Sequence, residues 1–307
     1  MPAQTPHSSS APRPAATRKP LRGVRVLSLA LNLPGPAALM RLRAMGAACV
    51  KLEPPTGDPM QAYQESAYAD LHTGVRELQA DLKAESGRKI LHRELARADV
   101  LLTSFRPSAL ARLGLDWKAM QRKYPTLSLV RIVGGPGAKA EIPGHDLTYM
   151  AELDLVNGLE LPPTLFADMG GALMASEAVL QALLQRHQRG RGSQCEVALS
   201  DAAAWLALPR HWSLTQPSGA VGGAHAGYRV YACRDGRVAA AALEPHFAAA
   251  LCDAAGITLR NAQELLAPAT RSALADWFAR QTRARLDALA LERDIPLHTL
   301  PPQRSRD

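Results

Sequence analysis

The chain has 307 residues, 47% of them hydrophobic and 21% charged, and this composition is typical of a globular protein of about two domains. Only 5% of the residues are aromatic, which leaves few platforms for stacking the bases of single-stranded nucleic acid. The net charge of +8 is spread along segments in which acidic and basic residues alternate, as in residues 93–99. We therefore expect no nucleic-acid partner, and no membrane span, because no apolar run approaches about 18 residues.

The cysteines and the N-terminal segment indicate a cytoplasmic protein. The four cysteines, at positions 49, 195, 233 and 252, lack the C-x-x-C spacing of redox and zinc sites, so we expect free thiols and no metal. Residues 1–20 are rich in Pro, Ala and Ser and contain no acid. Their five prolines disfavour the amphipathic helix of a transit peptide, and we expect a disordered tail.

From residue 21, short apolar strands alternate with helices. The strands are expected near residues 24–29, 49–52, 100–102, 127–132 and 195–197. The helices between and after them are expected at 36–45, 89–97, around 109 and 119, and at 147–157, 170–187 and 201–212. Strands separated by helices pair in parallel, so the pattern predicts an α/β domain over residues 21–212 with a doubly wound, Rossmann-like sheet.

A second, smaller α+β domain is expected over residues 228–301. Residues 213–227 lack periodicity and are predicted to be a linker. A hairpin follows, with strands at 228–232 and 238–242, and then helices at 245–255, 270–282 and 283–290. Residues 302–307 are expected to form a short tail.

The turn after the first strand, residues 32–36, argues against a dinucleotide enzyme. It lacks the G-x-G-x-x-G motif that brings a pyrophosphate close to the backbone. We therefore expect no nicotinamide or flavin cofactor.

Three polar residues stand in contexts marked by Gly or Pro: His145 within 143–146, Asp168 within 167–171, and Glu244 within 243–245. An imidazole and two carboxylates are sufficient for two-base proton transfer or for nucleophilic carboxylate chemistry. Each residue also has a simpler interpretation, since His145 fits a loop, Asp168 a helix N-cap and Glu244 a helix start. Only their joint occurrence favours a functional site.

The order of several motifs resembles the family III CoA-transferases, the CaiB/BaiF superfamily that includes the α-methylacyl-CoA racemases. The resemblance covers residues 21–301, nearly the whole chain. It is carried by residues 21–27, 46–59, 80–83, 105–107, 143–146 and 190–194. It implies an acyl-CoA substrate, with coenzyme A as part of that substrate and no separate cofactor, and an interlocked homodimer.

The resemblance also implies binding roles for residues of the large domain. Lys51 and Arg106 would face the CoA phosphates, residues 77–80 the adenosine, and residues 144–149 the pantetheine and thioester. The implied contacts are Lys51, Glu77, Leu78, Gln79, Ala80, Lys83, Arg106, Gly144, Asp146 and Tyr149.

Two chemistries fit this constellation. In the racemase branch, His145 and Asp168 act on opposite faces of the α-carbon of a 2-methylacyl-CoA, and Glu244 hydrogen-bonds the histidine. Backbone N–H groups of a helix beginning near Gly170 would stabilise the enolate oxygen. In the transferase branch, Asp168 alone attacks the acyl-CoA carbonyl to form a mixed anhydride, and an acceptor acid completes CoA transfer.

The racemase branch is favoured because residues 144–146 and 243–247 are typical of racemases, and because residues 222–225 lack the glycine run of the transferases. CoA transfer is the alternative. A catalytically silent CoA-binding or interaction protein is the third possibility. It is suggested by a short interval between His145 and Asp168 and by a chain end ahead of the family's C-terminal return.

Overall fold

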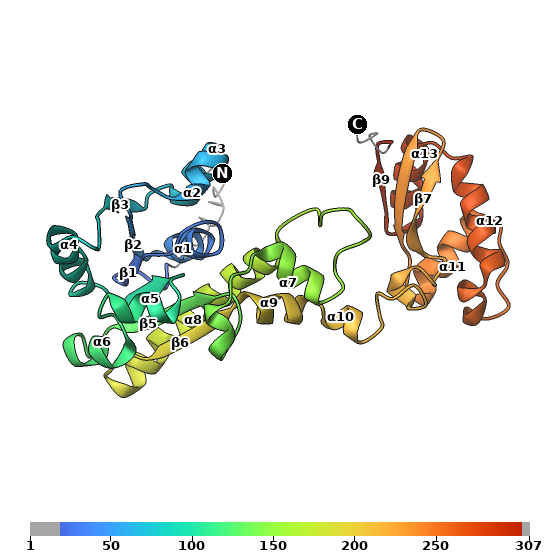
Figure 1. Cartoon of the computed structure of the whole chain (residues 1–307). Helices are drawn as coiled ribbons and strands as arrows, with labels where there is room; N and C mark the ends of the chain where they lie inside the picture. The colour runs from blue at the N-terminus through green and yellow to red at the C-terminus, as the bar shows by residue number, and fades with distance from the viewer. Residues whose placement is uncertain (1–18, 303–307) are drawn as a thin grey trace, which may run out of the picture. The chain divides into compact units, whose positions relative to one another are not determined.

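A computed structural model describes residues 19–302, which divide into two compact units (Figure 1). The boundary between the units lies at residues 206 and 207, six residues ahead of the predicted end of the large domain. Most of the predicted N-terminal tail and residues 303–307 lie outside the described residues.

The first unit is built on a six-stranded, fully parallel sheet with strand order β3-β2-β1-β4-β5-β6. This confirms the predicted Rossmann-like sheet. Strand β3 was not predicted, because it is an exposed edge strand without an apolar pattern. The strands are β1 (Arg25–Ser28), β2 (Ala48–Glu53), β3 (Arg76–Gln79), β4 (Val100–Thr103), β5 (Ser128–Val133) and β6 (Gln194–Ala198).

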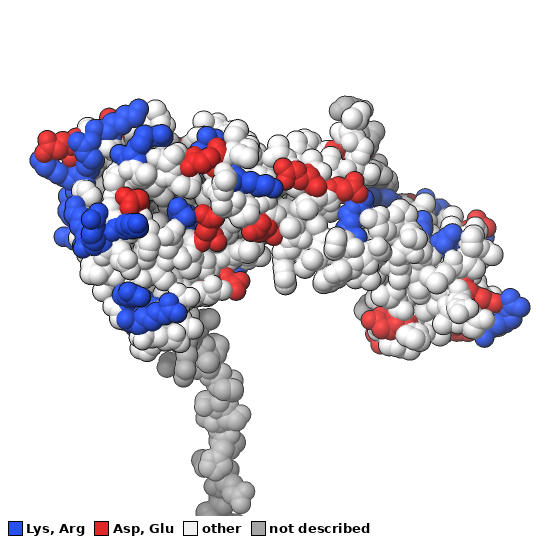
Figure 2. Space-filling model, turned by 60° about the horizontal axis from the view of Figure 1, so that its bottom comes forward, with Lys and Arg blue, Asp and Glu red and all other residues white. Residues whose placement is uncertain are grey.

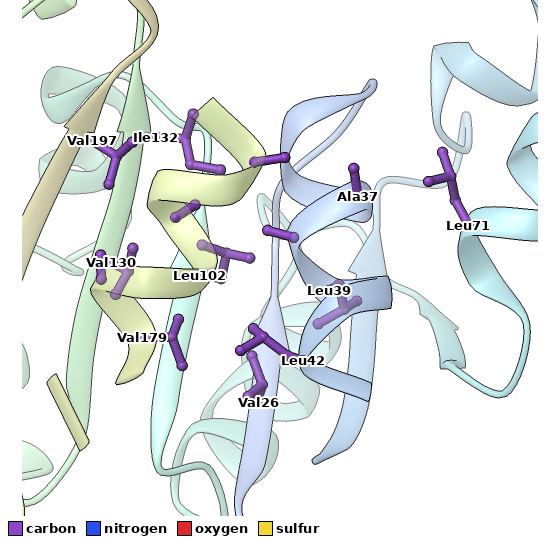
Figure 3. Close-up of a cluster of buried hydrophobic side chains, with 14 of the residues drawn as sticks. Val26, Ala37, Leu39, Leu42, Leu71, Leu102, Val130, Ile132, Val179 and Val197 are labelled. Carbon is purple, nitrogen blue, oxygen red and sulfur yellow. The ribbon is translucent and has the colours of Figure 1, made fainter. Parts of the chain in front are cut away.

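Helices cover both faces of this sheet. On one face, α1 (Pro34–Ala44) and α8 (Phe166–Arg189) pack side by side and bury the apolar cluster of Figure 3, with Val26, Leu102 and Val130 beneath them. A second apolar cluster lies under the helices of the other face. The remaining helices of the unit are α2 (Pro59–Tyr63), α3 (Glu65–His72), α4 (Glu85–Leu95), α5 (Pro107–Arg112), α6 (Trp117–Lys123), the 3₁₀ helix η1 (Gly137–Glu141), α7 (Asp146–Glu152) and α9 (Leu199–Leu206).

Four predicted helix bounds in this part of the chain are wrong. Helix α4 begins at Glu85, four residues before the predicted start. Helix α7 ends at Glu152 and not near 157, because Asp154 adopts a left-handed conformation (φ 56°) and the Leu155 N–H closes on the Met150 carbonyl at 3.0 Å. Helix α8 begins at Phe166, four residues before the predicted start. The predicted helix 201–212 is split into α9 and α10 (Leu208–His211).

The second unit confirms the predicted small α+β architecture. Its antiparallel sheet has the order β7-β8-β9, with the expected hairpin of β7 (Tyr228–Cys233) and β8 (Gly236–Ala241) and an unpredicted third strand, β9 (Leu297–Leu300). Residues 213–227, predicted to be a linker, contain the 3₁₀ helix η2 (Ala220–Gly222). The unit also has α11 (Pro245–Ala254), η3 (Ala262–Leu266), α12 (Pro268–Ala279) and α13 (Arg283–Arg293).

Helices α11, α12 and α13 pack with the small sheet around one core. Tyr231 of β7 stacks on Phe278 of α12 with ring centroids 4.9 Å apart. Ala226, from the predicted linker, is buried in the same core and donates its N–H to the Leu265 carbonyl at 2.7 Å. Across residues 19–302, no helix has both the length and the apolar character needed to span a membrane.

Candidate active site

A pocket of about 180 Å³ opens at the carboxyl ends of β1, β4 and β5. Asn32 lines it after β1, Ser104 and Arg106 line it after β4, and Gly134 lines it after β5. The strand order reverses between β1 and β4, and ligands of open α/β sheets bind at this kind of switch point. The topology alone therefore marks this pocket as the candidate active site.

His145 and Asp168, the two central predicted residues, both line this pocket. His145 is exposed and precedes the first turn of α7. Thr148 holds its backbone, because the Thr148 hydroxyl donates to the His145 carbonyl at 2.7 Å and accepts the His145 N–H at 3.1 Å. These bonds fix the main chain and leave the imidazole facing the pocket.

Asp168 is the third residue of α8 and not its N-cap. The residue at the N-cap position is the apolar Leu165, which offers no side-chain hydrogen bond. Asp146, which is only 4% exposed, supplies the missing cap: its Oδ1 accepts a hydrogen bond from the Asp168 backbone N–H at 2.9 Å. A carboxylate from α7 thus caps α8 and complements its dipole.

The expectation that N–H groups of a helix start near Gly170 stabilise the enolate oxygen is wrong. The helix does not begin near Gly170, so free N–H groups at that residue are not available at a helix start. The N–H of Asp168 is already bonded to Asp146.

The environment of Asp168 suits acid–base chemistry. Burial raises the pKa of its carboxyl to about 6, the Asp146 carboxylate raises it too, and His145 acts in the opposite direction. A carboxyl with such a pKa is ionised at neutral pH and is still a usable proton donor.

We predict that Asp146→Asn lowers the pKa of Asp168 from about 6 toward its ordinary 3.8. The substitution removes a negative charge, while the amide oxygen still accepts the Asp168 N–H. Any activity that needs ionised Asp168 rises with pH through this pKa, so its midpoint moves to lower pH in the variant. A ¹³C NMR titration of the aspartate carboxyls measures the change directly.

Glu152→Gln is the matched control, because it removes an exposed acid from the same helix α7. We expect this control to leave the titration of Asp168 in place. An unchanged pKa of Asp168 in Asp146→Asn would rule out the proposed electrostatic coupling.

The other predicted residues lie in several parts of the structure. Arg106, Gly144 and Tyr149 line the same pocket as His145 and Asp168, and Asp146 lies buried behind it. The segment of Glu77, Leu78, Gln79 and Ala80 begins on the edge strand β3, where the Glu77 carboxylate accepts from the Tyr68 hydroxyl at 2.5 Å. Glu244 precedes α11 in the second unit and is exposed.

Lys83 lines a separate, larger pocket of about 640 Å³. Arg88 and Arg112 add two further cations to this wall, and Phe105 adds an aromatic surface. Figure 2 shows Lys and Arg side chains gathered over the same end of the unit. Sequence reasoning missed Arg88 and Arg112, because helices α4 and α5 bring them together from separate segments.

Lys51 is not available to a phosphate, contrary to the sequence-based expectation. Its side chain is fully buried, and its Nζ lies 2.8 Å from Glu53, 2.5 Å from Asp58 and 2.8 Å from Nε2 of His72. His72 is buried here as well. Burial lowers the pKa of His72, so the neutral imidazole accepts from the ammonium.

Glu53, Asp58 and His72 also form a group that is close enough to hold a metal ion, with one donor atom from each within 4.8 Å of the others. The ammonium of Lys51 lies within bonding distance of all three. It therefore occupies the position that a cation would take. Asp58 in addition accepts the backbone N–H of Asn32 at 3.0 Å, which ties this cluster to the pocket wall.

We predict that Lys51→Met destabilises the protein by about 3–5 kcal/mol, because Glu53 and Asp58 would remain buried without their cation. Urea unfolding followed by circular dichroism measures the loss. Adding Asp58→Asn should recover part of it. Lys89→Met, which breaks an exposed pair with Glu85, serves as the control and should change stability little. Equal losses in both lysine variants would contradict the assignment.

Comparison with known proteins decides the family. The model of CoA-transferase family III matches residues 21–302, which is almost all of the chain. The chain belongs to this family. This confirms the resemblance seen in the sequence motifs.

Relatives of the chain within the family include both kinds of enzyme. The mouse α-methylacyl-CoA racemase is 31% identical over 288 residues, which cover 86% of this chain and 73% of the relative. The cinnamoyl-CoA:phenyllactate CoA-transferase of Clostridium sporogenes is 31% identical over 202 residues, covering 59% of this chain and 49% of the relative.

A solved structure agrees with the fold. A CaiB/BaiF family protein from Brucella suis superposes with a TM-score of 0.77 at 25% identity, over 94% of this chain and 85% of the other. The chain is therefore an enzyme-family member with a shared architecture, and its reaction has to be argued from the site.

Proposed function

We propose that this protein removes and returns the α-proton of a 2-methylacyl-CoA thioester, and so interconverts its two configurations. The observation that carries the proposal is the placement of two titratable groups, His145 and Asp168, on the wall of one pocket. The pKa of about 6 for Asp168 suits a group that acts as base in one direction and as acid in the other. The similarity to α-methylacyl-CoA racemase supports the same reaction.

In one direction, the Asp168 carboxylate takes the α-proton, and the electron pair of the C–H bond moves into the enolate. His145, in its protonated form, then gives a proton to the opposite face. In the reverse direction the two residues exchange roles. We further propose that Glu244, supplied by its own chain or by the partner chain of a homodimer, hydrogen-bonds His145 and holds its tautomer.

CoA transfer is the second candidate, since a CoA-transferase has the same 31% identity to this chain as the mouse racemase, although over 202 residues and not 288. Here an oxygen of Asp168 attacks the thioester carbon, and CoA leaves as the thiolate. The resulting mixed anhydride then passes through an enzyme thioester to the acceptor acid. Asp168 is needed in both chemistries, whereas His145 is needed only for racemisation.

Isobutyryl-CoA in deuterated water distinguishes these reactions, because this 2-methylacyl thioester has a single α-proton. We predict that the wild-type protein incorporates one deuterium, detected by mass spectrometry. Asp168→Asn should reduce the rate by about 10²- to 10⁴-fold. His145→Ala should lower exchange similarly.

Other outcomes have defined meanings. Transfer of CoA to an added carboxylic acid, without deuterium exchange, would show that the protein is a CoA-transferase and not a racemase. Neither reaction, with CoA still bound, would identify a catalytically silent CoA-binding protein. Exchange that is unaffected by His145→Ala would refute the two-base scheme.

We also propose that the pocket lined by Lys83, Arg88 and Arg112 binds the phosphates of the CoA nucleotide. Three cations beside the aromatic ring of Phe105 provide charge for phosphate and a face for adenine. The backbone carbonyl of Lys83 accepts from Arg88 at 2.6 Å, which fixes one of the cations on the wall.

We predict that Lys83→Ala weakens CoA binding about tenfold, the equivalent of about 1.4 kcal/mol for a charged hydrogen bond. Isothermal titration calorimetry with CoA measures the change, and the loss should shrink at high salt. Lys118→Ala is the control, since Lys118 is exposed on α6 and does not line this pocket. Equal affinities for both variants would exclude the assignment.

A further inference from the structure

The turn between β1 and α1 is bonded to side chains of the protein itself. In dinucleotide-binding sheets this turn binds a phosphate, because its backbone N–H groups point at the ligand. Here Ser104 Oγ accepts a hydrogen bond from the Leu31 N–H at 3.2 Å. Both carboxylate oxygens of Asp58 lie within bonding distance of the Asn32 nitrogen, at 3.0 and 3.2 Å. A carboxylate of the chain thus accepts from a turn N–H of the kind that a phosphate would use.

The Asp58 carboxylate is itself held in place by several bonds. It is only 3% exposed, and its Oδ1 also accepts the Met60 N–H at 3.0 Å. Its Oδ2 lies 2.5 Å from Nζ of the buried Lys51. Hydrogen bonds to ionised groups are shorter and stronger than neutral ones. Asp58 is therefore a fixed point to which the turn is attached.

Asn32, the residue that Asp58 holds, has an unusual backbone conformation. Its φ is 63°, in the left-handed region that few residues other than glycine adopt, although asparagine tolerates it better than most. Asn32 lines the pocket together with His145 and Asp168. The conformation of this one residue therefore determines part of the pocket wall.

Tyr63 places the same turn close to the reacting carboxylate. Its hydroxyl donates to Asn32 Oδ1 at 2.8 Å. Burial raises the pKa of the Tyr63 phenol, and the charges of Asp58 and Asp168 raise it further. The turn, its anchor and Asp168 thus lie within electrostatic reach of one hydroxyl.

We propose that Asp58 is a positioning residue for the reaction at Asp168. By accepting the Asn32 N–H, it holds Asn32 in the left-handed conformation and fixes the pocket wall against which the acyl group lies. This inference rests on the proposed function. A displacement of about 1 Å from the reactive geometry can lower a rate by about 10²-fold. Loss of the Asp58 carboxylate therefore slows turnover, although Asp58 does not touch the reacting atoms.

The first test is Asp58→Ala, with circular dichroism to confirm that the variant is folded. We expect kcat for exchange of isobutyryl-CoA, or for transfer if that is the reaction, to fall by about 10- to 10²-fold. Added formate should restore part of this loss, because the anion can bind between the Lys51 ammonium and the Asn32 N–H. Formamide, which has no charge, should not restore it.

Asp99→Ala is the matched control, because Asp99 makes the same kinds of bond at the other end of β1. Its carboxylate accepts the Arg25 N–H at 2.7 Å and pairs with Arg186. We expect this control to lower stability to urea and to leave kcat unchanged. Equal losses of kcat in the two variants would show general destabilisation and would overturn the proposal.

Two variants of Asn32 test the backbone conformation, and they decide the matter if Asp58→Ala does not fold. Both remove the carboxamide, but glycine adopts the left-handed conformation easily and β-branched valine does not. We expect kcat of Asn32→Val to be at least about tenfold below that of Asn32→Gly. Equal kcat values in these two variants would overturn the role of Asp58.

The inference and the proposed function fail in different ways. An active wild type that Asp58→Ala matches in kcat, or an Asp58→Ala variant that formate does not restore, would overturn the role of Asp58 alone. A wild type with neither exchange nor transfer would overturn the proposed function. In that case formate should still raise the urea midpoint of Asp58→Ala but not that of the wild type, and an unchanged midpoint would remove the inference as well.

Discussion

The active-site pocket depends on one hydrogen bond, from the backbone N–H of Asp168 to the buried carboxylate of Asp146. Helix α8 begins after an apolar residue, Leu165, and has no side-chain cap of its own. The cap comes from the first residue of α7, directly after His145. This hydrogen bond joins the starts of two helices that also pack against each other, and both helix starts place a side chain on the pocket wall.

The same contact contributes to the acidity of Asp168. Burial makes ionisation of Asp168 less favourable, the neighbouring Asp146 carboxylate acts in the same direction, and His145 opposes both. The protein accepts two neighbouring carboxyl groups because one of them satisfies a helix terminus. Asp146 therefore has two effects: it caps the start of α8, and it raises the pKa of Asp168.

Much of the architecture could be predicted from the sequence. Alternating apolar strands and helices were sufficient for the parallel sheet, and motif order was sufficient for the family. The pairing of His145 with Asp168 in one pocket also followed from that order. These features depend on local periodicity or on short motifs, both of which can be read along the chain.

The errors arise where a residue finds its partner far away in the sequence. The start of α8 was misplaced because its cap lies 22 residues away, in Asp146. Lys51 was expected to face the CoA phosphates, yet it is buried: the carboxylates of Glu53 and Asp58 compensate its charge, and His72, 21 residues away, accepts a hydrogen bond from it. Arg88 and Arg112 are 24 residues apart in the sequence. They line one pocket only because the fold brings α4 and α5 to the same wall.

The most direct test of the account is a crystal structure of the Asp168→Asn variant with isobutyryl-CoA bound. The account predicts the α-carbon between His145 and the side chain at position 168, with each reacting atom within about 3.5 Å of it. It also predicts the nucleotide half of CoA in the pocket lined by Lys83. A thioester bound away from His145 and position 168 would contradict the account.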